Sequence, residues 1–158
     1  AYATRAGTAA GIATHIGEQF ANQGLAVDVM PVEQVNDLSA YATVIVGSGI
    51  YIGKIIPKAM DFIEKNQSAL QNKAFHIFIA CMTLREDTEE NRKIVSDYLI
   101  PARAVVKPQS EGLFAGTINL SHLNLLEKMV VSSMQVPEGD YRNWPQIEAW
   151  AQAIPTAL

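Results

Sequence analysis

Short apolar runs alternate with amphipathic helical patterns along most of the chain. Apolar runs of strand type lie at residues 25–30, 43–46 and 75–80, and another lies within residues 105–114. Helical patterns run over residues 9–22, 57–70, 87–99 and 143–154. Buried strands that alternate with helices favour a parallel sheet covered on both faces. The sequence therefore predicts an α/β, doubly wound fold, with ligands bound beyond the carboxyl ends of the strands.

Composition sets the outer limits. The chain has 158 residues, of which 49% are hydrophobic and 18% charged, with a net charge of −4. We expect a single globular domain over residues 1–158, without the basic surface that nucleic acid or anionic lipid requires. One cysteine, Cys81, excludes an internal disulfide, and no run of about 18 apolar residues predicts a membrane span. A cytoplasmic location is the expectation.

A loop runs directly into the first helical pattern. It reads T-R-A-G-T-A-A-G from Thr4 to Gly11. Backbone N–H groups at a helix N-terminus are unpaired, and the helix dipole attracts an anion there. Gly7 lets the chain turn with a positive φ, and the hydroxyls of Thr4 and Thr8 add donors. The loop is a candidate phosphate cradle, with a plain helix cap as the alternative.

The loop lacks the residues of two common nucleotide sites. No lysine follows Gly7 or Gly11, as a triphosphate-binding loop requires, and their spacing does not match the three glycines of a dinucleotide site. Hydroxyls in place of glycines suit a terminal phosphate monoester. Only Ala1 and Tyr2 precede the loop, whereas a central strand of about 5 residues should lead into it. We expect the first strand to be truncated.

Several motifs resemble the flavodoxin-like family. They are Y-A-T-R-A-G-T-A at the phosphate loop, V-I-V-G-S-G-I-Y-I-G-K at residues 44–54, and the later G-L-F-A-G and N-W-P-Q-I-E-A-W. The carboxy-terminal pattern is most similar to a flavodoxin-domain branch that includes menaquinone-dependent protoporphyrinogen dehydrogenase. The resemblance covers nearly the whole chain. It implies a five-stranded parallel sheet of order 2-1-3-4-5 and bound FMN.

The resemblance also implies a set of cofactor-binding residues on three loops. They are Thr4, Arg5, Ala6, Gly7, Thr8, Ala9, Ser48, Gly49, Ile50, Tyr51, Gly53, Cys81, Met82 and Thr83. Flavodoxins usually carry threonine where Ala9 stands, so one hydroxyl donor is missing, and Arg5 either offsets part of this loss or is a solvated loop arginine. No catalytic or metal-binding residue is predicted.

A flavin ring needs an aromatic or apolar cover and backbone groups at its polar edge. Tyr51 is the candidate cover, and the neighbouring glycines would let the backbone approach the ring. The alternative is a loop that only anchors the core. Cys81 is interpreted as a small buried hydrophobic residue, because no partner cysteine or cationic neighbour is evident.

The remaining candidates are weaker. We expect His15 to face solvent, His76 to cap a strand edge, and His122 to lie near a substrate opening. Residues 120–136 carry an apolar stripe of Leu123, Leu126, Val130 and Met134. Such a stripe usually packs on its own domain. Left exposed, it would be a site for another subunit, a membrane surface or an apolar substrate such as a quinone.

We therefore expect an FMN-binding flavoprotein that carries electrons or acts as an oxidoreductase. The alternative implied by the resemblance is an FMN-dependent protoporphyrinogen IX dehydrogenase that uses a quinone acceptor. Expected partners are a redox protein or a small-molecule acceptor, with no nucleic acid and no transmembrane segment. Peripheral membrane contact and a homodimer stay open. A phosphorylated receiver module is disfavoured because Gly47 and Ser48, not aspartate, follow the apolar strand at residues 43–46.

Overall fold

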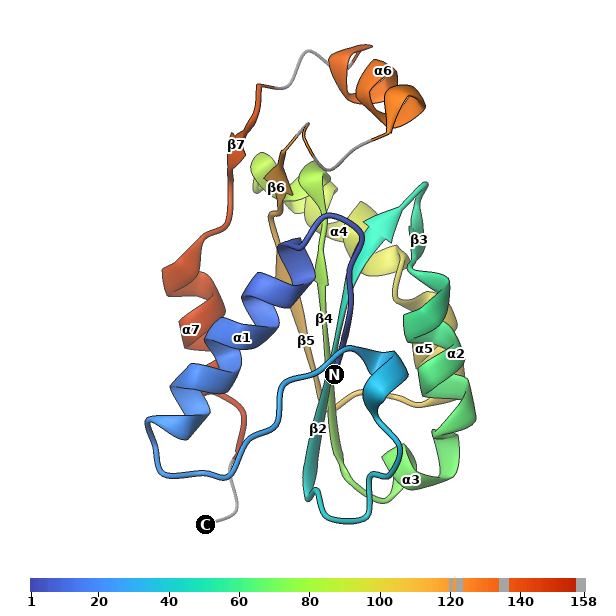
Figure 1. The fold of residues 1–158 in the computed structure, drawn as a ribbon, viewed down its shortest axis with the longest axis vertical. Coiled ribbons are helices and arrows are strands. Elements are labelled where there is room, and N and C mark those ends of the chain that lie inside the picture. Colours follow the sequence, from blue (N-terminus) through green and yellow to red (C-terminus); the bar gives the residue numbers. More distant parts are fainter. Residues whose placement is uncertain (120, 122–123, 134–136, 156–158) are drawn as a thin grey trace.

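The central feature of the protein is a twisted parallel sheet, described here from a computed structural model (Figure 1). The structure describes residues 1–119, 121, 124–133 and 137–155. Parallel strands are ordered β1-β2-β4-β5, and β3 pairs antiparallel with the end of β2. Their bounds are β1 Tyr2–Ala3, β2 Thr43–Tyr51, β3 Lys54–Ile55, β4 Ala74–Ala80 and β5 Ser110–Phe114. The predicted α/β class and its parallel sheet are confirmed.

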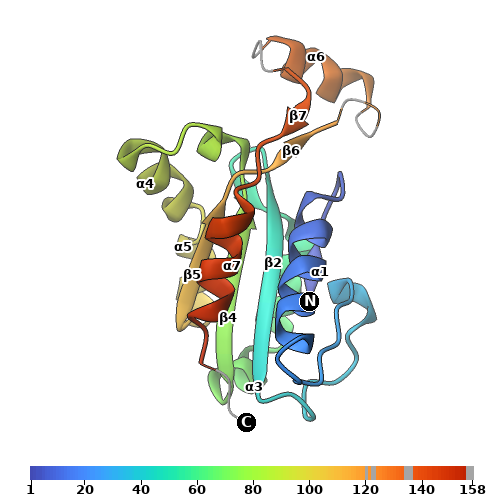
Figure 2. The same ribbon diagram turned by 90° about the vertical axis from the view of Figure 1, so that its left-hand side faces the viewer.

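Helices cover both faces of this sheet (Figure 2). One face carries α1 (Thr8–Ala21) and α7 (Trp144–Gln152). The other carries α2 (Pro57–Lys65), α3 (Gln67–Gln71), α4 (Glu89–Asp97) and α5 (Ile100–Val105). Short 3-10 turns, η1 (Val32–Gln34) and η2 (Met82–Arg85), lie in the connections. None of the helices that the structure describes is long and apolar enough to cross a bilayer.

Strand β4 joins the two hydrophobic cores. Phe75, Ile77 and Ile79 pack into the core with α2 and α5, whereas Phe78 and Ala80 pack into the core with α1 and α7. This alternation follows from the two-residue period of a strand that is buried on both faces. Gly47 on β2 makes room for the Phe78 ring, because a Cβ added there would lie 2.1 Å from Phe78 Cζ.

Helix boundaries follow local signals with two exceptions. Gly24, at φ 85°, follows the end of α1, and the side chain of Asn143 accepts a hydrogen bond from Gln146 N–H at the start of α7, as predicted. The predicted helix over residues 57–70 is instead broken at Asn66. The chain also continues as α5 beyond Leu99, because Pro101 occupies the first turn, where its missing N–H costs nothing.

The strand predicted at residues 25–30 is wrong. This segment forms no strand, and only Pro31 makes an isolated parallel bridge to Tyr2. The reason is its neighbour: β1 has only two residues, so a segment at this edge has almost no backbone to pair with. Val27 and Val29 remain 37% and 38% exposed.

A two-stranded ribbon rises from the carboxyl end of the sheet and carries one further helix (Figures 1 and 2). The ribbon consists of β6 (Thr117–Ile118) and β7 (Gly139–Asp140), and the helix is α6 (Leu125–Ser133). Leu125, Leu126 and Met129 are 64–75% exposed. The expected internal packing of this stripe is therefore wrong at Leu126; Leu123, Met134 and the side chain of Val130 lie outside the described residues.

Two of the histidines, His15 and His76, are more buried than predicted. His15 is half-buried, contacts the Trp144 ring and hydrogen-bonds Glu148 Oε1 at 2.9 Å. His76 is buried within β4, and its Nδ1 lies 2.8 Å from Ser110 Oγ, so it does not cap an exposed strand edge. His122 lies outside the described residues.

Candidate functional site

The N-terminus of α1 opens at the carboxyl end of the sheet. Gly7 precedes the helix with φ 84° and ψ −10°, a left-handed conformation that glycine adopts without steric cost. Its carbonyl accepts the Gly11 N–H at 2.9 Å, and no side chain caps the helix start. The N–H groups of the first turn are therefore directed outward, which makes this end of α1 attractive to an anion.

A cleft of about 580 Å³ lies in front of this helix end. One wall comes from the loop that leads into α1, and the other comes from the β6–β7 ribbon. The lining residues are Ala6, Gly7, Thr8, Thr117, Ile118, Asn119, Glu138, Gly139, Asp140 and Arg142. The hydroxyls of Thr8 and Thr117 lie 2.6 Å apart and join the two walls. Sequence reasoning predicted the first wall and missed the second.

Arg142 brings a positive charge to the cleft. A Cβ added to Gly11 would lie 2.6 Å from Arg142 Nη1, so the guanidinium packs directly on the first turns of α1. Arg142 donates from Nε and Nη2 to the two oxygens of Asp140, at 2.8 and 2.6 Å, and lies over the Trp144 ring. These hydrogen bonds hold the pKa of Asp140 below its usual value. Asp140 therefore stays ionised and holds the Arg142 guanidinium against the start of α1.

The second predicted loop meets the first through a ring contact. The Arg5 guanidinium lies 3.8 Å from the centre of the Tyr51 ring. Tyr51 ends β2, and Ile52 and Gly53 form the turn into β3 with φ of 48° and 68°. Two positive φ values are typical of a tight hairpin turn, but a β-branched residue there is strained. Ile52 is 80% exposed and was not predicted as a site residue. The sequence feature that could have identified it is an apolar residue directly before the turn glycine, Gly53.

The third predicted loop reaches the same region. Cys81 is buried, its N–H donates to Phe114 O at 2.9 Å, and its Sγ lies 3.4 Å from Thr83 Oγ1. Gly116 lies against this loop and α1, because a Cβ there would be 3.4 Å from Thr8 Cγ2 and 3.5 Å from Met82 Sδ. The ends of β4 and β5 therefore adjoin the helix N-terminus. Cys81 packs as a small buried side chain, as its interpretation requires.

Several other predicted site residues offer only their backbone to a ligand, or hold the surrounding fold in place. Ala9 is fully buried in the α1 core, so only its backbone is available to a ligand. The Ser48 hydroxyl is buried, accepts the Ile56 N–H at 3.1 Å and donates to Gly49 O at 2.7 Å. These bonds fix the chain between β2 and α2. Ile50 pairs with Ile55 in the hairpin, and Thr4 is half-buried directly after β1.

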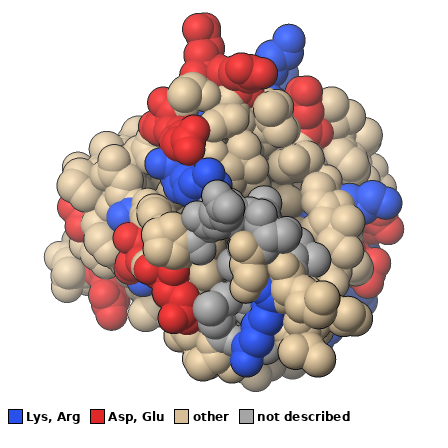
Figure 3. All heavy atoms as spheres, turned by 90° about the horizontal axis from the view of Figure 1, so that it is seen from above, with Lys and Arg blue, Asp and Glu red and all other residues tan. Residues whose placement is uncertain are grey.

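The end of the molecule that carries the cleft has mixed charge. Acidic and basic side chains alternate there with broad uncharged surface between them (Figure 3). An anion that entered the cleft would meet local donors, namely the α1 amides, Thr8 and Arg142, beside the carboxylates of Glu138 and Asp140, and not a field of one sign. Such a donor set suits a phosphate monoester.

Comparison with solved structures gives the same architecture. The rubredoxin oxygen:oxidoreductase from the anaerobe Desulfovibrio gigas superposes with a TM-score of 0.53 at 18% sequence identity. The match covers 97% of this chain and 33% of that one, so this chain spans about a third of the length of the larger protein. At this identity, the likeness shows the fold alone. No curated protein sequence matches the chain.

A family model supplies the classification. The model of the flavodoxin domain matches residues 1–143, which include the loop before α1, the hairpin turn and the β6–β7 ribbon. The chain therefore belongs to the flavodoxin-domain family.

Proposed function

We propose that this protein binds FMN noncovalently at the α1 cleft and transfers electrons to a redox partner. The observation that carries the proposal is the helix start at Gly7, with its outward N–H groups walled by Thr117 and Arg142. Membership of the flavodoxin-domain family supports the same cofactor.

The residues present fit this cofactor. A phosphate monoester dianion has three oxygens that need several donors, and the first turn of α1 and the Thr8 hydroxyl provide them. Two carboxylates, Glu138 and Asp140, line the same cleft, so the Arg142 guanidinium, which is bonded to both oxygens of Asp140, would reach the phosphate with the N–H groups that this pair leaves over. A Cβ at Gly7 would meet no atom within 4 Å, so the space in front of the loop is open to a ligand. Bound FMN would supply one- and two-electron redox chemistry.

The other loops would hold the ring system. Tyr51 offers an aromatic face, and Ile52 offers an exposed apolar one at the tip of the hairpin. The backbone at Gly49 and Gly53 would approach the polar edge of the ring, because a glycine has no side chain to hold the ring away. Met82 and Thr83 lie on the loop that borders Gly116. Together, these residues bind, orient and shield the cofactor.

Two glycines allow a matched test of the cradle. Gly7 and Gly24 have φ of 84° and 85°, and a Cβ at either would meet nothing within 4 Å. Valine at either position should destabilise the fold by a similar amount, about 1–2 kcal/mol, because both force a left-handed β-branched residue. Only Gly7→Val places the change at the cleft. We expect it to weaken FMN binding at least tenfold in a fluorescence titration, while Gly24→Val leaves binding unchanged.

The same experiment can contradict the proposal. Purified protein that is colourless and does not quench added FMN would exclude the cofactor. Equal loss of affinity in both glycine variants would show that fold stability, not the cradle, controls binding. Electron transfer is checked separately by reducing the bound flavin electrochemically and recording its reoxidation by a soluble benzoquinone.

A second candidate is quinone-linked dehydrogenation of protoporphyrinogen IX. The exposed side chains of Leu125, Leu126 and Met129 favour it, because the ribbon that carries them also walls the cleft. We expect Leu126→Ser with Met129→Ser to reduce turnover with menaquinone while FMN affinity is retained. Ile100→Ser, which alters an exposed apolar residue on α5, is the matched control. Absence of turnover in the FMN-loaded protein would exclude this candidate and leave the electron carrier.

A further inference from the structure

Four side chains form a row between α1 and α7, which lie side by side on one face of the sheet (Figure 2). In order, they are Arg142, Trp144, His15 and Glu148. Arg142 Cζ lies 4.4 Å from the centre of the Trp144 ring, and the centres of the Trp144 and His15 rings are 4.6 Å apart. His15 Nε2 lies 2.9 Å from Glu148 Oε1. Because Arg142 lines the cleft, the row begins at the candidate site.

Helical spacing brings these side chains together. Gly11 and His15 are four residues apart on α1, and Trp144 and Glu148 are four residues apart on α7, so each pair shares one helix face. Gly11 leaves room for the guanidinium, because a Cβ there would lie 2.6 Å from Arg142 Nη1. A larger residue at position 11 would displace the guanidinium from α1.

Arg142 is held by two groups of different character. Asp140 accepts hydrogen bonds from its Nε–H and from Nη2, at 2.8 and 2.6 Å, and the guanidinium lies over the Trp144 ring. The Arg142 side chain is only 18% exposed. Asp140 is a charged acceptor that competes with a phosphate for the guanidinium. The Trp144 ring carries no charge and attracts the cation without competing for it in this way.

We propose that Trp144 is a positioning residue, which holds the Arg142 guanidinium at the cleft and thereby makes the protein select flavins that carry a phosphate. The inference rests on the proposed function, in which the cleft holds the phosphate of FMN. An arginine that is already fixed loses less side-chain freedom on binding than a mobile one does. The ring therefore strengthens the contact to the phosphate without touching the ligand.

Riboflavin and FMN isolate the effect of the phosphate, because they have the same ring system and only FMN carries that group. The quantity to measure is the ratio of the Kd for riboflavin to the Kd for FMN in fluorescence titrations. We expect Trp144→Leu to lower this ratio about fivefold or more, because leucine fills space but has no ring face for the cation. Trp144→Phe keeps a ring and should restore most of the ratio.

Two further variants show whether Trp144 acts through Arg142. Trp150→Leu makes the same change at the other tryptophan of α7, which packs on Phe78 and Phe114, and it should leave the ratio unchanged. In an Arg142→Ala background, Trp144→Leu should lower the ratio no further, because the group that it positions is gone.

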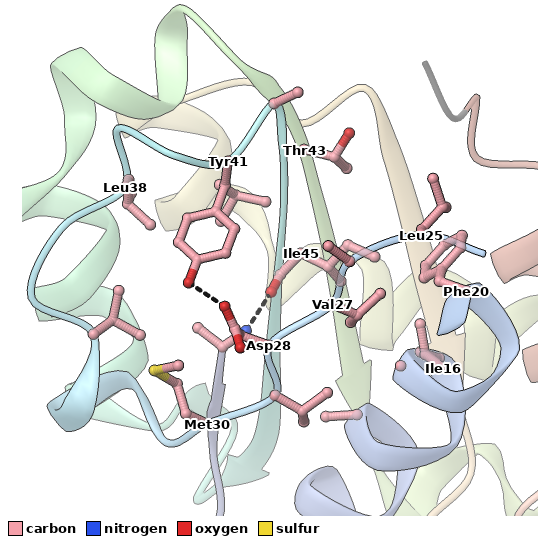
Figure 4. Close-up of a pocket in the computed structure, with 18 of the residues that line it drawn as sticks. Ile16, Phe20, Leu25, Val27, Asp28, Met30, Leu38, Tyr41, Thr43 and Ile45 are labelled. Carbon is pink, nitrogen blue, oxygen red and sulfur yellow. Dashed lines mark hydrogen bonds between the residues drawn. The ribbon is translucent and has the colours of Figure 1, made fainter. Parts of the chain in front are cut away.

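Three results of these titrations would overturn the inference. Equal losses of FMN and riboflavin affinity in Trp144→Leu would mean that the ring only supports the fold. Additive losses in the double variant would mean that Trp144 acts without Arg142. A ratio that depends on neither residue would mean that the flavins bind elsewhere. An apolar groove of about 330 Å³ beside β2, which shares no lining residue with the cleft, offers such a place (Figure 4).

The position of Arg142 can also be measured without a flavin. Its Nε–H signal in an NMR spectrum reports the hydrogen bond to Asp140. Exchange of this hydrogen with solvent should become about tenfold faster or more in Trp144→Leu, but not in Trp150→Leu. Unchanged exchange in Trp144→Leu would overturn the positioning role even if FMN binds. Faster exchange in a protein that binds neither flavin would instead contradict the proposed function, while the positioning of Arg142 by Trp144 would stand.

Discussion

The Arg5 guanidinium lies 3.8 Å from the centre of the Tyr51 ring and covers one face of it. The phosphate loop and the hairpin loop are thus joined by a cation–π contact. Such contacts at exposed sites contribute about 0.5–1 kcal/mol, which a bound ring and phosphate can replace. If FMN binds as we propose, we expect Arg5 to leave the Tyr51 ring and contact the phosphate.

Tyr51 should contribute to FMN affinity through its ring. We expect Tyr51→Ala to weaken binding about two- to twelvefold, because aromatic stacking adds about 0.5–1.5 kcal/mol beyond area burial. Tyr51→Phe keeps the ring and should bind FMN almost as the unmodified protein does, in a fluorescence titration. A phenylalanine variant as weak as the alanine one would assign the effect to the hydroxyl.

Arg142 should contribute through its charge. Arg142→Ala should weaken FMN binding by about tenfold or more, since hydrogen bonds to charged groups contribute about 1.5–3 kcal/mol. Arg92→Ala makes the same charge change at the exposed pair with Asp87 and serves as control in calorimetric titrations. Similar losses in the two variants would mean that only the overall charge matters.

Substitution of two glycines of β2, Gly47 and Gly49, should affect the stability of the protein differently. A Cβ at Gly47 would lie 2.1 Å from the Phe78 ring, whereas one at Gly49 would meet only Ile56 Cδ1 at 3.4 Å. Gly47→Ala should therefore lower the free energy of unfolding by about 1–3 kcal/mol or more through overpacking. Gly49→Ala should change it by less than about 1 kcal/mol, measured by urea denaturation. Equal effects would contradict the packing assigned to Phe78.

His76 should make stability depend on pH. Burial lowers its pKa below 6.5, so the unfolded chain binds a proton more readily than the folded one. Stability is full above the unfolded pKa and falls as pH drops below about 6.5 toward the folded value. In denaturation curves between about pH 5 and 8, His76→Phe should reduce this slope. Above about pH 7.5, the free energies of unfolding of the two proteins should depend on pH in the same way. An unchanged slope in the variant below that pH would mean that other groups cause the pH dependence.

The parts of the fold set by local chemistry were predictable. Asn143 precedes a helix that it caps, and β4 is an apolar run long enough to be buried on both faces. The Gly7 turn was predictable because a glycine with neighbouring hydroxyls stands directly before a helical stripe. The break at Asn66 was not, since the helical pattern continues through it.

The missing half of the site is formed by distant parts of the chain. Thr117 and Arg142 reach the cleft only because β6 and the chain that follows β7 pass beside the first turn of α1, and no short motif encodes that approach. The error at residues 25–30 has the same origin. Their apolar composition fits a strand, but a strand also needs a partner, and two residues of β1 do not provide one.

The ribbon connects the exposed side chains of α6 to the wall of the cleft. Thr117 touches Thr8, while the strands on either side of α6 are paired only with each other among the described residues. A protein or apolar molecule that binds to Leu125 and Met129 would therefore shift the ribbon that lines the cleft. Binding of a partner at α6 and binding of FMN at the cleft would then be coupled, so the partner could raise or lower the affinity for FMN without contacting it.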